Sequence, residues 1–210
     1  MERKRVLLLD MYGVIIKESR GYFIPYTFGK FNKCEHVRIS KLFWEDGLFT
    51  EAGNGRLSSN GFLSLLGYEN PVETMQDYLK NYLTFDREFL HFAENNYKQY
   101  DFVLLSNDIH EWSMYLLELY GLFKYFKDII TSGSVHMRKP EKQIFLYVLD
   151  YIRCMPGKCI YVDNSIKNLD AAQNIGINTI LFNRDNEIYK GNVVNNFQEL
   201  GQLLKEWDRI

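Results

Sequence analysis

The sequence is short of the features that mark membrane, secreted and zinc-binding proteins. Its 210 residues contain no apolar run approaching the about 20 residues that a membrane-spanning helix needs. Asp10 interrupts the first apolar stretch, so the start of the chain does not resemble a signal peptide. The three cysteines and four histidines form no C-x-x-C pair and no zinc spacing, which is typical of a reduced, cytoplasmic protein.

An excess of positive charge is also missing. Lysine and arginine number 25 against 27 aspartates and glutamates, which gives a formal net charge of −2. A general nucleic-acid binder needs a basic surface, so nucleic acid is not expected as a partner. Apolar residues, in contrast, make up 46% of the chain, and at this length they are enough for one substantial core.

Short apolar runs are the most regular feature of the sequence. Several end at acidic, amide or turn residues, as strands buried on both faces of a parallel sheet do. Five runs predict strands, at residues 6–9, 102–105, 128–131, 159–162 and 177–182. Helical patterns lie between the later runs, at residues 111–123, 141–152 and 168–177, and an amphipathic stretch follows at 197–207. This alternation predicts an α/β fold, an open Rossmann-like parallel sheet flanked by helices.

The first two predicted strands are separated by an interval far too long for one crossover. Residues 17–84 contain apolar clusters at helical spacing, and a structureless loop of this length would be exceptional. The segment is therefore predicted to be a small all-helical domain inserted after the first strand. The α/β core domain is then residues 1–16 and 85–210, and Asp86 is predicted to cap the helix that returns to it.

Polar side chains gather where the predicted strands end, and in an open α/β sheet this edge is where ligands bind. Each residue alone is weak evidence, because strand ends often carry turn formers and helix caps. Together, however, such residues occur in four successive segments that reach the same edge of the predicted sheet, and this combination indicates a functional site. The residues are Asp10, Ser106, Asn107, Lys139, Asp163 and Asn164.

This ordered set resembles the motifs of the haloacid dehalogenase-like (HAD) hydrolase superfamily. The four matching segments are LLLDMYGVI, VLLSND, MRKPEKQIF and IYVDNSIKNLDAAQNIGI, and together they cover the whole predicted sheet domain. The resemblance points to the phosphatase-rich branch, in which a small helical cap domain follows the first strand. It implies hydrolysis of a small phosphorylated metabolite.

The resemblance also implies roles for the residues at the strand ends. Asp10 would attack phosphorus and form an aspartyl-phosphate, which divides one difficult step into two. Ser106, the backbone N–H of Asn107 and Lys139 would hold the phosphoryl oxygens and stabilise the charge of the transition state.

A Mg²⁺ ion is the cofactor that the resemblance implies. It would lie between Asp10, Asp163 and the backbone carbonyl of Tyr12, because Mg²⁺ prefers oxygen ligands. Asn164 would orient a water molecule on the metal.

One position departs from the phosphatase pattern of the superfamily. That pattern places a second aspartate two residues after the nucleophile, where it protonates the leaving alcohol, and here the residue is Tyr12. A phenol with an ordinary pKa of about 10 is a poor base at neutral pH. Three outcomes stay open: a leaving group that needs little protonation, a substitute acid, or weak turnover. The substitutes that lie within reach in sequence are Asp46, Glu51, Asp108, His110 and Glu111.

Two other functions are open on the sequence alone. Dehalogenases of the superfamily also carry a tyrosine two residues after the nucleophile. They have serine where this chain has Asp163, however, and this chain has Asn168 where they have their water-activating aspartate. The fold could also serve a non-catalytic phosphate-binding protein. The sequence indicates neither the substrate nor the oligomeric state.

The helical insertion offers candidate substrate contacts. Core packing is favoured over pocket lining for most of its aromatic residues, and an exposed helix start is favoured for Arg56. The aromatic candidates are Tyr22, Phe23, Tyr26, Phe43 and Trp44.

Overall fold

A computed structural model describes residues 4–208, which form one six-stranded sheet in the order β3-β2-β1-β4-β5-β6. All neighbouring strands run parallel, so the predicted fold class is confirmed. The short edge strand β6 was not among the predicted strands. The strands are β1 (Val6–Leu9), β2 (Asp101–Ser106), β3 (Phe126–Thr131), β4 (Cys159–Asp163), β5 (Asn178–Phe182) and β6 (Asn192–Val194).

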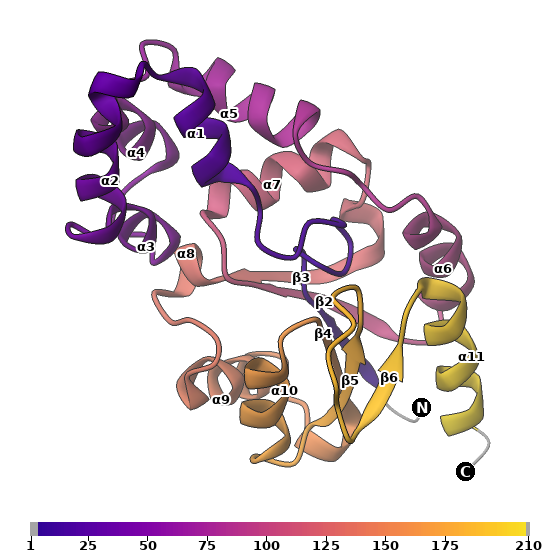
Figure 1. Cartoon of the computed structure of the whole chain (residues 1–210). Helices are drawn as coiled ribbons and strands as arrows, with labels where there is room; N and C mark the ends of the chain where they lie inside the picture. The colour runs from indigo at the N-terminus through magenta and orange to yellow at the C-terminus, as the bar shows by residue number, and fades with distance from the viewer. Residues whose placement is uncertain (1–3, 209–210) are drawn as a thin grey trace.

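Helices cover both faces of this sheet (Figure 1). Leu8 points to one face, where α9 (Lys142–Tyr151) and α10 (Ile166–Gln173) pack. Leu7 and Leu9 point to the other face, as the two-residue period of a strand requires. That second face is covered by α6 (Glu88–Asn96), α7 (His110–Leu119) and α11 (Phe197–Trp207).

The chain between β1 and β2 folds into helices above the carboxyl ends of the strands (Figure 1). We call residues 23–81 the helical insertion. Two of the apolar clusters expected from the sequence fall within its second and fourth helices, and the third begins in its fifth helix and continues past the end of that helix. Its helices are α1 (Phe23–Lys30), α2 (His36–Trp44), α3 (Leu48–Gly53), α4 (Ser59–Leu66) and α5 (Pro71–Asn81). That the insertion is a separate domain stays a prediction.

The insertion is packed onto α7 through Trp112, which is buried. The ring of Trp112 lies 4.9 Å from that of Phe23, 5.4 Å from that of Tyr78 and 6.1 Å from that of Phe62, between ring centroids. Its indole N–H donates a hydrogen bond of 2.7 Å to Ser59 Oγ. One continuous hydrophobic cluster therefore includes residues of the insertion and of the sheet.

A second contact joins α3 to the short helix α8 (Ser132–Val135). Ser132 Oγ donates a hydrogen bond to the carbonyl of Gly53. Gly55 has φ +73°, and a Cβ there would stand 2.0 Å from the carbonyl oxygen of Gly133. A Cβ on Gly133 would in turn stand 2.9 Å from the carbonyl oxygen of Asp108. Three backbone segments thus meet without room for a side chain.

Two linkers connect the insertion to the sheet, and they pair with each other. Lys17 N–H donates to the carbonyl of Thr84 at 2.9 Å, and Asp86 N–H donates to the carbonyl of Ile15 at 3.0 Å. Asp86 Oδ1 also accepts from Glu88 N–H at 3.1 Å, at the start of α6, which agrees with the predicted capping role.

Arg184, just after β5, holds these linkers against the sheet. Its guanidinium donates to the carbonyls of Gly13 at 3.1 Å and Val14 at 2.8 Å, and it pairs with the buried carboxylate of Asp86. Arg184 therefore ties the loop that follows Asp10 to the end of β5 and to Asp86.

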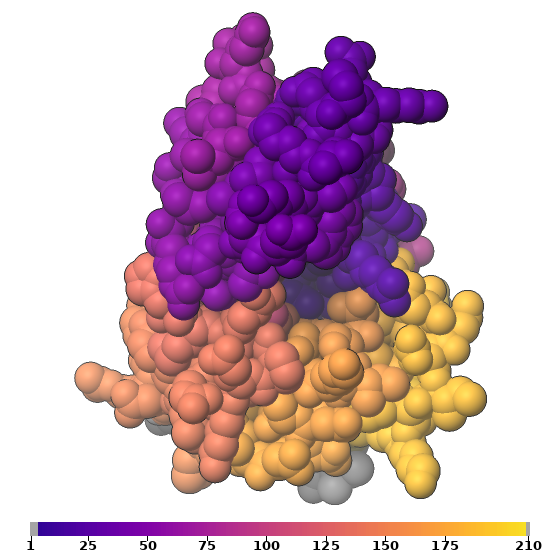
Figure 2. All heavy atoms as spheres, turned by 60° about the vertical axis from the view of Figure 1, so that its left-hand side comes forward, coloured from indigo at the N-terminus to yellow at the C-terminus, as the bar shows by residue number. Residues whose placement is uncertain are grey.

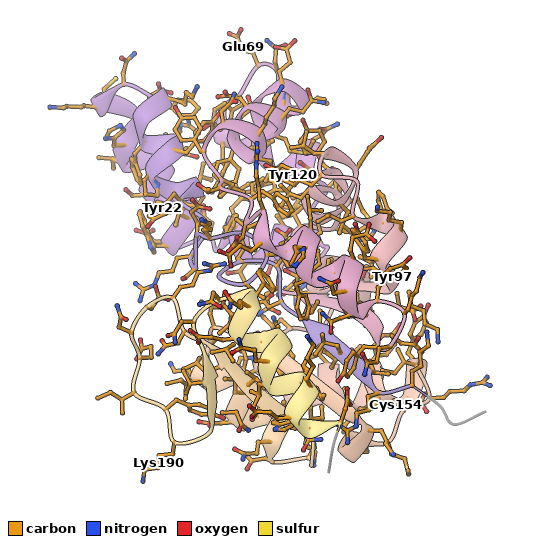
Figure 3. The ribbon with its side chains drawn as sticks, turned by 90° about the vertical axis from the view of Figure 1, so that its right-hand side faces the viewer. Tyr22, Glu69, Tyr97, Tyr120, Cys154 and Lys190 are labelled. Carbon is orange, nitrogen blue, oxygen red and sulfur yellow. The ribbon has the colours of Figure 1, made fainter. Side chains whose placement is uncertain are left out.

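No helix within residues 4–208 combines the length and the apolar character that crossing a membrane requires. The three cysteines form no disulfide, and Cys154 lies at the end of the molecule away from the insertion (Figure 3).

Candidate active site

The site forms where the order of the strands reverses, between β1 and β4. Leu9 is in register with Val162, so Asp10 and Asp163 stand at the ends of neighbouring strands. The N–H of Asp10 donates to the carbonyl of Val162 at 3.1 Å, which continues the parallel ladder to the edge of the sheet. The crevice beyond this switch point is the usual ligand site of an open α/β sheet.

The ammonium group of Lys139 bridges the two acids. Lys139 Nζ lies 2.8 Å from Asp10 Oδ1 and 2.8 Å from Asp163 Oδ2, and it donates to the carbonyl of Leu105 at 2.8 Å. The side chain of Lys139 is 1% exposed. Burial alone lowers the pKa of Lys139, but the charges of Asp10 and Asp163 outweigh it and raise the pKa above its usual value.

Asn107 places this lysine. Its side-chain amide donates to the carbonyl of Lys139 at 2.8 Å and accepts from the N–H of Lys139 at 2.8 Å. The Lys139–Pro140 peptide bond is cis. The sequence suggested only a backbone role for Asn107, because nothing in the spacing indicates that its side chain meets a residue 32 positions away.

Asp163 is fully buried, and its two oxygens are already occupied. Oδ2 accepts from Lys139, from the hydroxyl of Tyr161 and, at 3.1 Å, from Asn168 Nδ2. Oδ1 accepts from Ser165 N–H at 2.7 Å and from Asn168 at 3.2 Å. Tyr161 was not predicted as a partner of Asp163, although it lies two residues earlier and so on the same face of the strand.

Asp10 differs from Asp163 in having one open oxygen. Oδ1 accepts from the N–H of Met11 at 2.7 Å and pairs with Lys139, whereas Oδ2 accepts no hydrogen bond from any residue between 4 and 208. Burial, and then the charge of Asp163, raise the pKa of Asp10 to about 7, against the lowering effect of Lys139.

A pocket of about 220 Å³ lies above Asp10, between the sheet and the insertion. Figure 2 shows the hollow between the helices of the insertion, in indigo, and the core, in orange and yellow. A second hollow of about 430 Å³ shares four residues with the pocket, and we call these four the mouth: Ser19, Arg20, Asn164 and Ser165. The other pocket residues are Asp10, Tyr12, Gly21, Phe49, Tyr78, Asn107, Asp108, Trp112, Lys139 and Asn168.

Tyr12, at the position of the missing second aspartate, faces Asp108. The hydroxyl of Tyr12 lies 3.4 Å from each carboxylate oxygen of Asp108. Asp108 Oδ2 also accepts from Ser113 Oγ at 2.6 Å. Burial, opposed by these hydrogen bonds, raises the pKa of Asp108 to about 7. Burial and the charge of Asp108 raise the pKa of Tyr12 well above its usual value.

Of the five candidate substitutes for the missing acid, only Asp108 lines the pocket. Glu111 accepts from the N–H of Ser59, and His110 bonds to Thr131. Glu51 pairs with Arg56 at 2.6 Å outside the pocket, which agrees with the surface position expected for that arginine.

The aromatic residues proposed for the insertion do not line the pocket. Phe23, Tyr26 and Phe43 are buried in the core, as favoured, while Trp44 and Tyr22 are exposed (Figure 3). The rings that do line it are those of Tyr12, Phe49, Tyr78 and Trp112. These residues come from four separate segments, so no local sequence pattern joins them.

Two further observations bear on ligand binding. The hydroxyl of Ser106 is buried at the end of β2 and has no hydrogen-bond partner within the described residues. Asn164 packs so closely over Gly13 that a Cβ on this glycine, at φ +80°, would stand 2.4 Å from Asn164 Cγ. No group of three histidine, cysteine or acidic side chains is placed to hold a metal anywhere in residues 4–208.

Fold and site together define an open α/β protein with an aspartate at the switch point of its sheet. The sequence model of the haloacid dehalogenase-like hydrolases matches residues 4–176, and the chain belongs to this family. The phosphorylated carbohydrates phosphatase of Thermotoga maritima is 26% identical over 83% of this chain and 82% of that protein. Drimenol cyclase drtB of Aspergillus calidoustus is 27% identical over 47% of this chain, but that match spans only 17% of the cyclase.

Solved structures share the fold. A HAD family enzyme of Bacteroides thetaiotaomicron, in complex with magnesium and inorganic phosphate, superposes with a TM-score of 0.71 at 21% identity. The superposition covers 90% of this chain and 98% of that one.

Proposed function

We propose that the protein is a phosphomonoester hydrolase that works through an aspartyl-phosphate on Asp10. The observation that carries the proposal is the asymmetry of the Asp10 carboxylate at the base of the pocket. One oxygen is fixed by Lys139 and Met11, and the other has no partner among the described residues. A carboxylate held in this way presents a single oxygen for attack.

The neighbouring groups support a phosphoryl ligand. The partnerless hydroxyl of Ser106 would gain a phosphoryl oxygen as acceptor, and Lys139 would supply positive charge beside it. As the open oxygen of Asp10 bonds to phosphorus, the bond to the leaving alcohol oxygen breaks, and that oxygen takes up a proton from water in the pocket. A water molecule then attacks phosphorus and gives up a proton to solvent, and the bond from phosphorus to Asp10 breaks, which releases inorganic phosphate and restores the Asp10 carboxylate.

Mg²⁺ remains the proposed cofactor, with the ligands expected from the sequence. Asp10, Asp163 and the carbonyl of Tyr12 would hold the ion, Asn164 would orient a water molecule on it, and a substrate phosphate would complete the oxygen ligands. The open oxygen of Asp10 fits this role, whereas Asp163 also accepts from Lys139 and from the N–H of Ser165 and would share an oxygen with the ion. The ion would supply positive charge that screens the phosphoryl oxygens from the carboxylate.

The test is a panel of small phosphate esters with one 2-haloacid, assayed with Mg²⁺ or with EDTA. Wild type should release phosphate in Mg²⁺ and lose this activity in EDTA. Asp10→Asn keeps the size of the side chain but removes the nucleophile, so phosphate release should fall to background. Asp170→Asn, at an exposed acid of α10 outside the pocket and the adjoining hollow, is the matched control.

The same panel separates the alternatives. Halide release that EDTA does not affect would replace the phosphatase with a dehalogenase. Phosphate binding without release, unchanged in Asp10→Asn, would indicate a non-catalytic phosphate-binding protein.

A further inference from the structure

Asp108 is a buried carboxylate that the proposed reaction does not use. It is 5% exposed and stands at the start of α7, where its backbone is bonded to Ser132 and Gly133. Its side chain accepts from Ser113 and lies near the hydroxyl of Tyr12, but it makes no ion pair within residues 4–208. Burial disfavours the ionised form of such a carboxylate, and a cationic ligand beside it would stabilise that form.

Neither cation of the pocket compensates Asp108. Lys139 is committed to Asp10 and Asp163. Arg20 is exposed at the mouth and forms no ion pair with Asp108. Glu111, in the first turn of α7, adds negative charge nearby. Burial is the main cause of the raised pKa of Asp108, and the charge of Glu111 raises that pKa further.

Four aromatic residues line the pocket that contains this carboxylate. Tyr12, Phe49, Tyr78 and Trp112 line the same pocket as Asp108. The rings of Trp112 and Phe49 lie 6.2 Å apart, and those of Trp112 and Tyr78 lie 5.4 Å apart. Burial raises the pKa of the Tyr78 hydroxyl, and the charge of Asp108 raises it further. Proteins use aromatic rings together with a carboxylate to bind ammonium groups, and this pocket holds both.

We propose that the substrate is the phosphate monoester of a small amino alcohol, whose ammonium group binds Asp108 among these four rings. This inference rests on the proposed function, because the phosphate must occupy the end of the pocket at Asp10. The volume of about 220 Å³ is below the range of about 300–1,000 Å³ typical of drug-sized ligand sites, which favours a short substrate. The pocket thus has a phosphate end and an ammonium end.

The test compares two esters of nearly equal size, 2-aminoethyl phosphate and 2-hydroxyethyl phosphate. Wild type should hydrolyse the amino ester with a kcat/KM about tenfold higher or more, because only its ammonium group pairs with Asp108. In Asp108→Asn the ratio of the two kcat/KM values should fall towards one. In Asp170→Asn, which removes an exposed acid outside the pocket and the adjoining hollow, the ratio should stay as in wild type.

Binding of the matching phosphonates by calorimetry measures recognition without turnover. Wild type should bind 2-aminoethylphosphonate more tightly than 2-hydroxyethylphosphonate. Equal kcat/KM values in wild type, or a ratio that Asp108→Asn leaves unchanged, would overturn the ammonium site while the phosphatase stands. If no ester is hydrolysed and the two phosphonates bind equally, both proposals are lost. If no ester is hydrolysed but the aminophosphonate is preferred, only the phosphatase is lost.

Discussion

At the scale of single residues, the site depends on one ammonium group between two carboxylates. Lys139→Met would leave Asp10 and Asp163 buried side by side without compensation. Breaking a buried ion pair in this way costs about 3–5 kcal/mol. We expect the free energy of unfolding, measured in urea, to fall by about this amount and phosphate release to disappear.

Lys127→Met is the control for this substitution. Lys127 pairs with Asp101 at the same distance of 2.8 Å, but its side chain is 61% exposed. Exposed pairs contribute about 1 kcal/mol or less, so the control should unfold nearly as wild type does. Equal losses in the two variants would contradict the account of Lys139.

A second prediction concerns pH and lies in the insertion, away from the pocket. Hydrogen bonds from Lys30 and then Asn81 lower the pKa of Asp77 to about 2, below its ordinary value of 3.8. Because the folded pKa is the lower one, Asp77 stabilises the fold above about pH 4, and the effect is lost as pH falls towards 2. The difference in unfolding free energy between wild type and Asp77→Asn should follow this course.

The size of that difference should stay below about 1 kcal/mol, because both partners are partly exposed and solvent screens them. Added salt should reduce it further. A difference that grows as the pH falls from 4 to 2 would have the wrong sign.

The residues at the strand ends could be predicted because register alone brings them together. Asp10 and Asp163 follow neighbouring parallel strands, so their proximity needs no knowledge of side chains. The side chains that bind Asp163 could not be predicted. They are those of Tyr161 and Asn168, whose orientations are set by packing.

At the scale of elements, Arg184 couples β5 to the loop that carries the nucleophile. Arg184→Met removes donors to Gly13 and Val14 and leaves the buried Asp86 carboxylate unpaired. We expect a loss of about 2 kcal/mol or more in unfolding free energy and a lower kcat with little change in KM, because Asp10 loses its fixed position.

Arg184→Lys separates charge from geometry. A lysine can restore the ion pair with Asp86 but not the forked contacts to two carbonyls. It should recover most of the stability while kcat stays low. A kcat that recovers in parallel with stability would mean that the forked geometry has no role.

The elements themselves were predicted to different degrees. Strands β1, β2, β4 and β5 read directly as apolar runs because helices cover both of their faces. The edge strand β6 has three residues, two of them exposed, so it carries no such run. Helix α10 begins at Ile166, before the predicted start, because Asp163 binds the N–H of Ser165 and turns the chain early.

At the scale of the whole molecule, the insertion and the sheet share one hydrophobic cluster. We therefore expect unfolding followed by Trp fluorescence and by far-ultraviolet circular dichroism to give one coincident transition. Trp112→Ala should lower the unfolding free energy by about 3–5 kcal/mol, because it opens a cavity between α7 and the insertion.

Trp44→Ala is the control, since Trp44 belongs to the insertion but is 62% exposed. It should change the unfolding free energy by about 1 kcal/mol or less. Two separate transitions in the wild-type protein would show that the insertion unfolds on its own.

That a helical segment interrupts the sheet could be predicted from its length and apolar spacing alone. How it meets the sheet could not, because the contact relies on Trp112 of α7 and on a meeting of backbones at Gly55 and Gly133.

That meeting of backbones has a consequence for how the protein tolerates sequence change. Gly55 touches Gly133, and Gly133 touches the carbonyl of Asp108, so even an added methyl group at residue 55 must displace the chain behind the pocket acid. In a random library selected for turnover, position 55 should accept almost nothing but glycine, although it never meets the substrate. The exposed Gly29 and Gly157, each with open space around them, should accept many replacements.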